Sequence, residues 1–93
     1  MPEFTHIAGK NAGNIKLFAL STCIWCKKTR ALLDELKLDY YYMYVDLLER
    51  NDSEDAKTEV RKWNPQCSFP TLVINNESCI KGFDEARIRE LAQ

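Results

Sequence analysis

Short apolar and aromatic runs along the chain predict the strands of a sheet. Residues 15–20 form an apolar run bounded by polar residues, which suits a strand with at least one buried face. Residues 40–46 are rich in tyrosine and favour a second strand, on which the tyrosines pack with their hydroxyls in water. Residues 71–74 predict a third strand, and a tight turn at Asn75 and Asn76 leads to a short fourth strand at residues 78–80.

Three other segments repeat their apolar residues with the period of a helix. The first starts near residue 24 and has leucines on one side and a solvated basic face that contains Lys27, Lys28 and Arg30. The second has its apolar stripe at residues 56, 60 and 63 and is expected to begin at a cap formed by Asp52 or Ser53. The last follows Gly82 and is expected to begin at Asp84.

The order of these elements is βαβαββα, which predicts an α/β fold. A helix between the first two strands makes them parallel, and the last two strands form a hairpin. We therefore expect a four-stranded mixed sheet flanked by helices in a single domain that covers residues 15–93. Residues 1–14 are polar and contain Gly9 and Gly13, so we expect a loosely ordered lead-in there.

Composition narrows the classes of function. The net charge of −1 gives no electrostatic reason to expect a nucleic acid partner. No run approaches the roughly 20 apolar residues needed to cross a bilayer, and the first residues lack the apolar core of a signal peptide. We expect a cytoplasmic protein that does not bind membranes, in a compartment where structural disulfides are rare.

Two of the four cysteines, Cys23 and Cys26, are three positions apart at a junction between a strand and a helix. Ser21 and Thr22 precede them and supply capping chemistry. The positive end of a helix favours an anion, so Cys23 is expected to react as a thiolate. Cys26 lies about one turn further into the helix and is expected to be more buried. This predicts thiol–disulfide exchange, in which Cys23 attacks a disulfide and Cys26 resolves the mixed disulfide.

Two other roles for the cysteines are open at this stage. A structural zinc site usually needs two close pairs of ligands, but Cys67 and Cys79 are isolated and the single histidine, His6, is in the lead-in. A binding module with buried structural thiols is the other alternative, and this interpretation suits Cys79 on its short strand. Cys67, three residues before Pro70, is either a loop thiol without a role or a third redox thiol.

The run IKLFAL before CIWCKK, SFPT at residues 68–71 and KGFD at residues 81–84 together resemble the glutaredoxin branch of the thioredoxin superfamily. The resemblance covers roughly residues 15–92 and implies a thioredoxin fold. It implies that Pro70 is cis and that the residue before it offers backbone groups to an extended substrate. It also implies a redox pair, Cys23 and Cys26, and a substrate site that contains Trp25, Lys27, Ser68, Phe69, Pro70, Gly82, Phe83 and Asp84.

The resemblance further implies a monomeric thiol–disulfide oxidoreductase that reduces protein disulfides or mixed disulfides with glutathione. No cofactor is required, and electrons come from glutathione or from a reductase of the thioredoxin-dependent or ferredoxin-linked type. Two departures from the family pattern are Leu20, where a lysine is frequent, and Ile24, where a proline is frequent. The Gly82-Phe83 step resembles redoxins that take electrons from a thioredoxin-type reductase and serve ribonucleotide reductase, which is one alternative. The other is a carrier of a [2Fe–2S] cluster held by Cys23 and glutathione, because some glutaredoxins without that proline bind one.

Overall fold

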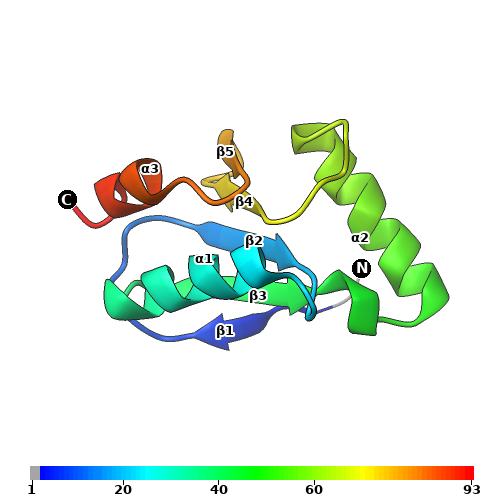
Figure 1. The fold of residues 1–93 in the computed structure, drawn as a ribbon, viewed down its shortest axis with the longest axis horizontal. Helices are drawn as coiled ribbons and strands as arrows, with labels where there is room; N and C mark the ends of the chain where they lie inside the picture. The colour runs from blue at the N-terminus through cyan, green and yellow to red at the C-terminus, as the bar shows by residue number, and fades with distance from the viewer. Residues whose placement is uncertain (1–2) are drawn as a thin grey trace.

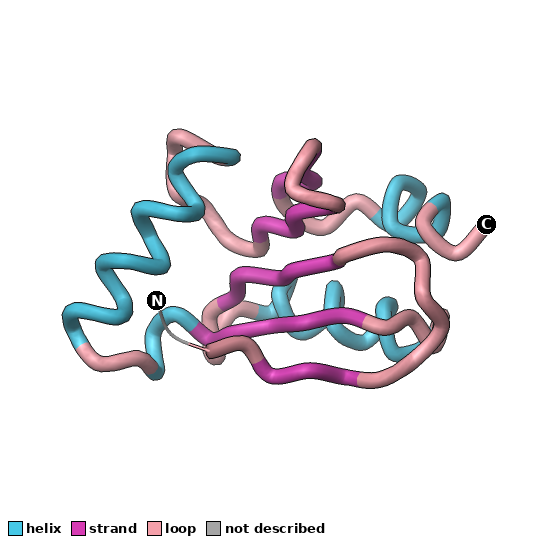
Figure 2. The backbone as a smooth tube through the Cα atoms, turned by 180° about the vertical axis from the view of Figure 1, so that it is seen from behind, coloured by secondary structure: helices cyan, strands magenta, loops and turns pink. Residues whose placement is uncertain are grey.

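The structure is a computed structural model, and it describes residues 3–93. A mixed sheet of five strands, in the order β1-β3-β2-β4-β5, forms its centre (Figure 1). Helix α1 lies in front of β2 and β3 in Figure 1 and behind the same strands in Figure 2. In chain order the elements are β1 (Thr5–Ile7), β2 (Ile15–Ala19), α1 (Ile24–Glu35), β3 (Tyr40–Tyr44), the 3-10 helix η1 (Val45–Leu47), α2 (Arg50–Trp63), β4 (Thr71–Ile74), β5 (Ser78–Lys81) and α3 (Glu85–Glu90).

The register of the sheet confirms the βαβ unit and the hairpin. β2 and β3 are parallel, with Phe18 opposite Met43, whereas β4 runs antiparallel to β2 and β5 antiparallel to β4. Asn75 and Asn76 both have positive φ, as a tight turn between two antiparallel strands requires. The thioredoxin fold is therefore the architecture of this chain.

The sheet has five strands rather than the predicted four, because part of the expected lead-in is ordered. β1 pairs antiparallel with β3, with His6 opposite Tyr41. Gly9 passes so close to the backbone of Leu38 that a Cβ there would lie 2.6 Å from its carbonyl carbon. A strand of three residues with two exposed side chains has too little apolar patterning to be detected in sequence. Residues 1–2 of the lead-in are outside the described residues.

The sheet separates two layers of apolar side chains, because successive residues of a strand point to opposite faces. Leu17, Leu72 and other residues pack with α1 and α3 in one cluster. Phe18, Val73 and their neighbours pack with α2 in the other. Within residues 3–93, no helix is both long enough and apolar enough to cross a membrane.

Two of the predicted helix caps are wrong, although α1 does begin at Ile24, as expected. α1 is capped by Cys23 itself rather than by Ser21 or Thr22. α2 begins at Arg50, with Glu49 as its N-cap, and so starts before Asp52 and Ser53. Leu48, just before this cap, packs against the α2 cluster. The third start, at Asp84, is confirmed, since its side chain accepts the N–H of Arg87 at 3.1 Å.

Arg30 was expected on a solvated helix face because of its charge, but this prediction is wrong. Its guanidinium lies 3.9 Å from the ring centroid of Tyr42 and donates to the hydroxyls of Tyr40 and Tyr44 at 3.2 and 3.0 Å. Tyr40 is fully buried, and its hydroxyl donates to Asp34 at 2.7 Å. Burial raises the pKa of Tyr40 to about 12. The tyrosines of β3 thus hold α1 against the sheet through Arg30, and the hydroxyl of Tyr40 is not in water.

Candidate active site

Cys23 lies where the chain leaves β2 and enters α1, at the N-cap of the helix. Its sulfur accepts the backbone N–H of Cys26 at 3.2 Å, and its own N–H donates to the carbonyl of Leu20 at 3.2 Å. The side chain is half-buried, so a substrate sulfur can still reach it. A sulfur that takes an N–H at the positive end of a helix is in a position that stabilises a thiolate.

Cys26 has the opposite environment. Only 1% of its surface is exposed, and it packs in the cluster between α1 and the sheet. Burial, followed by the hydrogen bond with Cys23, raises the pKa of its thiol from 9.0 to about 12. Cys26 is therefore a protonated thiol at neutral pH, one turn away from an accessible partner. Cys26 is more buried than Cys23, as their positions in the sequence predict.

The loop between β2 and α1 is tied to the end of β3 by Asp46, a residue that the sequence analysis missed. The carboxylate accepts the backbone N–H of Ser21 at 2.8 Å and its hydroxyl at 2.5 Å. A signal was available in principle, because parallel strands such as β2 and β3 end at the same edge of a sheet. A polar residue directly after the second strand was therefore a candidate neighbour of the cysteine loop.

The segment before β4 forms the other side of the site, and its peptide bond between Phe69 and Pro70 is cis, as the family resemblance implies. The Pro70 carbonyl accepts the N–H of Gly82 at 2.8 Å, which joins this segment to the loop before α3. Within residues 3–93 the backbone N–H and C=O of Phe69 have no hydrogen-bond partner. Both groups are therefore available to an extended substrate.

Ser68 is held by a network that the sequence did not reveal. Asn64, whose exposure is only 1%, donates to the Ser68 carbonyl and hydroxyl at 3.3 and 2.8 Å. Thr71 donates to the same carbonyl at 2.8 Å. The polar groups of Ser68 thus fix the loop in front of Phe69, and its predicted contact with a substrate remains a prediction.

Trp25 and Phe83 form one wall of an open cleft of about 230 Å³, which is otherwise lined by Phe69, Pro70 and Gly82. The two aromatic rings are stacked, with centroids 6.0 Å apart and planes at 25°. About half of the Trp25 surface is exposed, and Nζ of Lys28 lies 4.6 Å from its ring centroid. Every lining residue is uncharged, so the cleft suits an apolar side chain.

The structure brings together most of the predicted site residues. Five of them line the cleft, and the redox pair begins the helix that carries Trp25. Asp84 caps α3 through the N–H of Arg87, so its carboxylate already has a structural partner. Lys27 is exposed on α1 and does not line the cleft; the neighbouring Lys28 is the lysine that contacts Trp25.

The other two cysteines are associated with the α2 side of the sheet. The Cys79 thiol donates to the carbonyl of Trp63 at 3.3 Å, and Cys67 packs against the α2 cluster with its sulfur 3.9 Å from the carbonyl of Lys57. All four cysteines are free thiols. Among residues 3–93, no three histidine, cysteine, aspartate or glutamate side chains gather in a way that could hold a metal ion.

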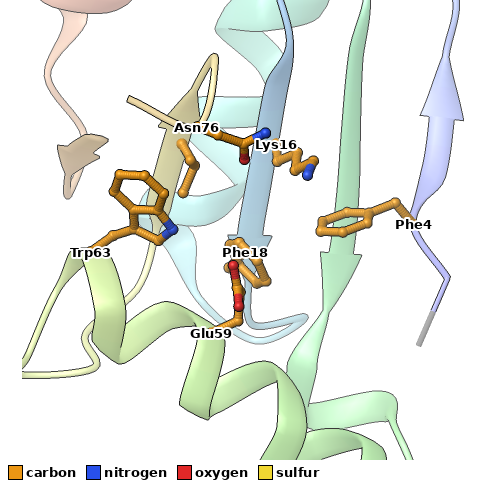
Figure 3. Close-up of a pocket in the computed structure, with 7 residues that line it drawn as sticks. Phe4, Lys16, Phe18, Glu59, Trp63 and Asn76 are labelled. Carbon is orange, nitrogen blue, oxygen red and sulfur yellow. The ribbon is translucent and has the colours of Figure 1, made fainter. Parts of the chain in front are cut away.

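A second cavity, of about 30 Å³, lies on the α2 face. Figure 3 shows six of the residues that line it: Phe4, Lys16, Phe18, Glu59, Trp63 and Asn76. That is about the volume of one water molecule in the liquid. The ring of Phe4 meets that of Phe18 edge to face, with centroids 5.4 Å apart. This cavity is too small for a substrate, and the cleft beside Trp25 is the better candidate site.

Comparison with known proteins agrees with this geometry. A glutaredoxin family model matches residues 15–79. Methanoredoxin of Methanosarcina acetivorans is 46% identical, with a TM-score of 0.88, over 90% of this chain and 88% of that chain. The glutaredoxin of Methanosarcina mazei Go1 is 47% identical, with a TM-score of 0.88, over 98% of this chain and 88% of that chain. A glutaredoxin-like 8.6 kDa protein in the rubredoxin operon of Clostridium pasteurianum is 32% identical over 79 residues, covering 85% of this chain and 97% of that protein.

Proposed function

Because this chain belongs to the glutaredoxin family, we propose that it is a dithiol oxidoreductase that reduces disulfides of proteins through Cys23 and Cys26. The observation that carries the proposal is the difference between the two sulfurs. Cys23 is accessible at the N-cap of α1, whereas burial keeps Cys26 protonated. An attacking thiolate and a resolving thiol need these two environments.

The exchange takes place in two balanced steps. The Cys23 thiolate attacks one sulfur of the substrate disulfide, so a Cys23–substrate disulfide forms and the other substrate sulfur leaves as a thiolate. Cys26 then gives its proton to the leaving thiolate and attacks Cys23, which releases the second substrate sulfur as a thiolate that takes a proton from water. The substrate gains two electrons and two protons, and the protein ends with a Cys23–Cys26 disulfide.

The direct test is a single turnover of the reduced protein with an excess of hydroxyethyl disulfide. We expect each protein molecule to reduce one disulfide and to form one internal disulfide, which peptide mapping assigns to Cys23 and Cys26. Cys67 and Cys79 should remain free thiols, because each is associated with the other side of the sheet. Oxidation of Cys67 or Cys79 with an intact Cys23 would contradict the proposal.

The cleft also suggests which electron donor is preferred. Its lining residues carry no charge, and Leu20 stands where the family often has a lysine, so a tripeptide with two carboxylates finds few partners there. An aromatic wall next to the sulfurs suits a protein surface better. We therefore propose that a thioredoxin-type reductase is a better donor than glutathione, in a reducing compartment such as the cytoplasm.

We expect the oxidised protein to be reduced faster by an NADPH-dependent thioredoxin reductase than by glutathione with its own reductase. NADPH consumption is compared at equal concentrations of the oxidised protein, with a ferredoxin-linked reductase as the third donor. A higher rate with glutathione would contradict this order of donors while leaving the dithiol chemistry intact.

The two remaining candidate roles are less supported. A redoxin that donates electrons to ribonucleotide reductase would use the same dithiol chemistry, with that enzyme as its acceptor. The described residues offer no group of three metal-binding side chains, so a [2Fe–2S] cluster would need a second chain and added thiols. Anaerobic reconstitution with iron, sulfide and glutathione tests the cluster: a brown dimer would support it, and a colourless monomer would contradict it.

A further inference from the structure

The carboxylate of Asp46 accepts two hydrogen bonds from Ser21, which lies two positions before Cys23. One carboxylate oxygen takes the Ser21 N–H at 2.8 Å, and the other takes the Ser21 hydroxyl at 2.5 Å. Hydrogen bonds to a charged acceptor are stronger than those between neutral groups. The contact therefore fixes both the main chain and the side chain of the loop that leads to the redox pair.

Few other hydrogen bonds hold this loop in place. Cys23 N–H closes a turn onto the Leu20 carbonyl, which is a bond within the loop itself. Among residues 3–93, the hydrogen bonds of Ser21 and Thr22 to other elements all go to Asp46. Asp46 belongs to η1, directly after β3, so its hydrogen bonds to Ser21 fix the loop relative to the sheet.

The carboxylate also places a negative charge near the sulfurs. The hydrogen bond from Ser21 is the main reason why the pKa of Asp46 lies below its ordinary value, so the group is ionised at neutral pH. Its charge is among the causes that raise the pKa of Cys26. Because Cys26 is protonated at neutral pH, the charge acts on the reduced pair through the thiolate that Cys23 forms in the proposed exchange, which a nearby negative charge disfavours.

From this geometry we propose that Asp46 is a positioning residue of the redox site, which holds the Ser21–Cys23 segment and, through its charge, disfavours the reduced pair relative to the disulfide. The inference rests on the proposed dithiol function. It assigns the two effects to different atoms, because the hydroxyl of Ser21 contributes only to positioning and the carboxylate contributes to both.

Three single substitutions separate these effects. Asp46→Asn removes the charge but keeps an oxygen that can accept the Ser21 N–H. Ser21→Ala removes the hydroxyl and leaves the charge. Asp39→Asn is the matched control, because Asp39 precedes β3, at the opposite end of the strand, where it accepts from His6 at 2.7 Å. Far-ultraviolet circular dichroism and thermal unfolding confirm that each variant is folded.

The reduction potential of the Cys23–Cys26 pair is measured by equilibration with glutathione buffers, and turnover is measured with hydroxyethyl disulfide. We expect Asp46→Asn to shift the equilibrium constant about threefold toward the dithiol, which is a rise of about 14 mV. We expect Ser21→Ala to lower kcat/KM by about threefold to tenfold without changing the potential. Asp39→Asn should change neither quantity.

Two results would overturn the inference: a potential for Asp46→Asn equal to that of Asp39→Asn, or a kcat/KM for Ser21→Ala equal to that of the wild type. The potential is a property of the sulfur pair and does not depend on any substrate. If the wild type failed to reduce disulfides, the proposed function would be wrong, yet the potentials would still decide the role of the Asp46 charge.

Discussion

Replacement of Cys23 by serine should lower disulfide reduction by at least about 10³-fold, the scale on which removal of a nucleophile acts. A serine hydroxyl remains protonated at neutral pH and cannot attack a disulfide sulfur. The same change at Cys26 should leave the first step intact and block the second, because no other thiol lies on the same helix turn. Cys26→Ser should therefore accumulate a mixed disulfide with a protein substrate, visible as a shifted band on a non-reducing gel.

Cys79→Ser is the matched control for these variants. Its thiol donates to the carbonyl of Trp63, a hydrogen bond that a serine hydroxyl can also make. We expect its turnover with insulin disulfides to equal that of the wild type. Equal losses in Cys79→Ser and Cys23→Ser, or full activity in Cys23→Ser, would show that the catalytic pair is wrongly assigned.

The second large effect concerns the reactivity of Cys26 once Cys23 has been replaced by serine. A rise of its pKa from 9.0 to about 12 makes the thiolate fraction at neutral pH about a thousandfold smaller than that of an ordinary cysteine. Burial, the main cause of the rise, is retained in the variant. Alkylation of Cys26 by iodoacetamide at pH 7.5 should therefore be slower, by up to about 10³-fold, than that of the same cysteine in guanidinium-unfolded protein, because the variant lacks the hydrogen bond and charge of Cys23 that add to the rise.

The dependence on pH separates acidity from simple lack of access. If the raised pKa is the cause, the alkylation rate in the folded variant rises about tenfold per pH unit beyond pH 9, where the unfolded chain levels off. A rate that is slow but levels off near pH 9 would show that burial blocks the reagent and that the pKa is ordinary.

The same shift predicts a change in stability. The folded pKa lies above the unfolded value, so the folded reduced protein retains its proton more strongly, and this contribution is fully present below pH 9. It is lost as the pH rises toward 12. Tyr40 acts in the same direction, since burial raises its pKa as well. The reduced protein should therefore lose unfolding free energy in alkaline solution.

Local patterning was sufficient for the elements whose apolar residues repeat regularly. The strand at residues 71–74, the helix start at Asp84 and the positions of Cys23 and Cys26 on the first turn of α1 could all be anticipated in this way. Each depends on residues within a few positions of one another, where periodicity and capping rules are informative.

The features that the sequence analysis did not anticipate depend on polar residues that meet across the fold. Asp46 and Ser21 are 25 positions apart, and the carboxylate is one of many in the chain. In the sequence Arg30 has the pattern of an ordinary surface charge, whereas in the structure it bonds to the tyrosines of β3. A basic residue on a helix has the same sequence signature whether it faces water or a ring, because the difference is made by the tertiary neighbour.

The two tryptophans give the protein a built-in optical reporter. Trp25 lies between the two cysteines at the start of α1, with its indole half in solvent and stacked on Phe83, whereas Trp63 ends α2 and packs on the opposite face of the sheet. Emission from Trp25 therefore responds to the sulfurs and to whatever enters the cleft, and Trp63 provides a steady background. With Trp63 replaced by phenylalanine, a stopped-flow instrument could follow each half of the catalytic cycle without a dye or a coupled enzyme.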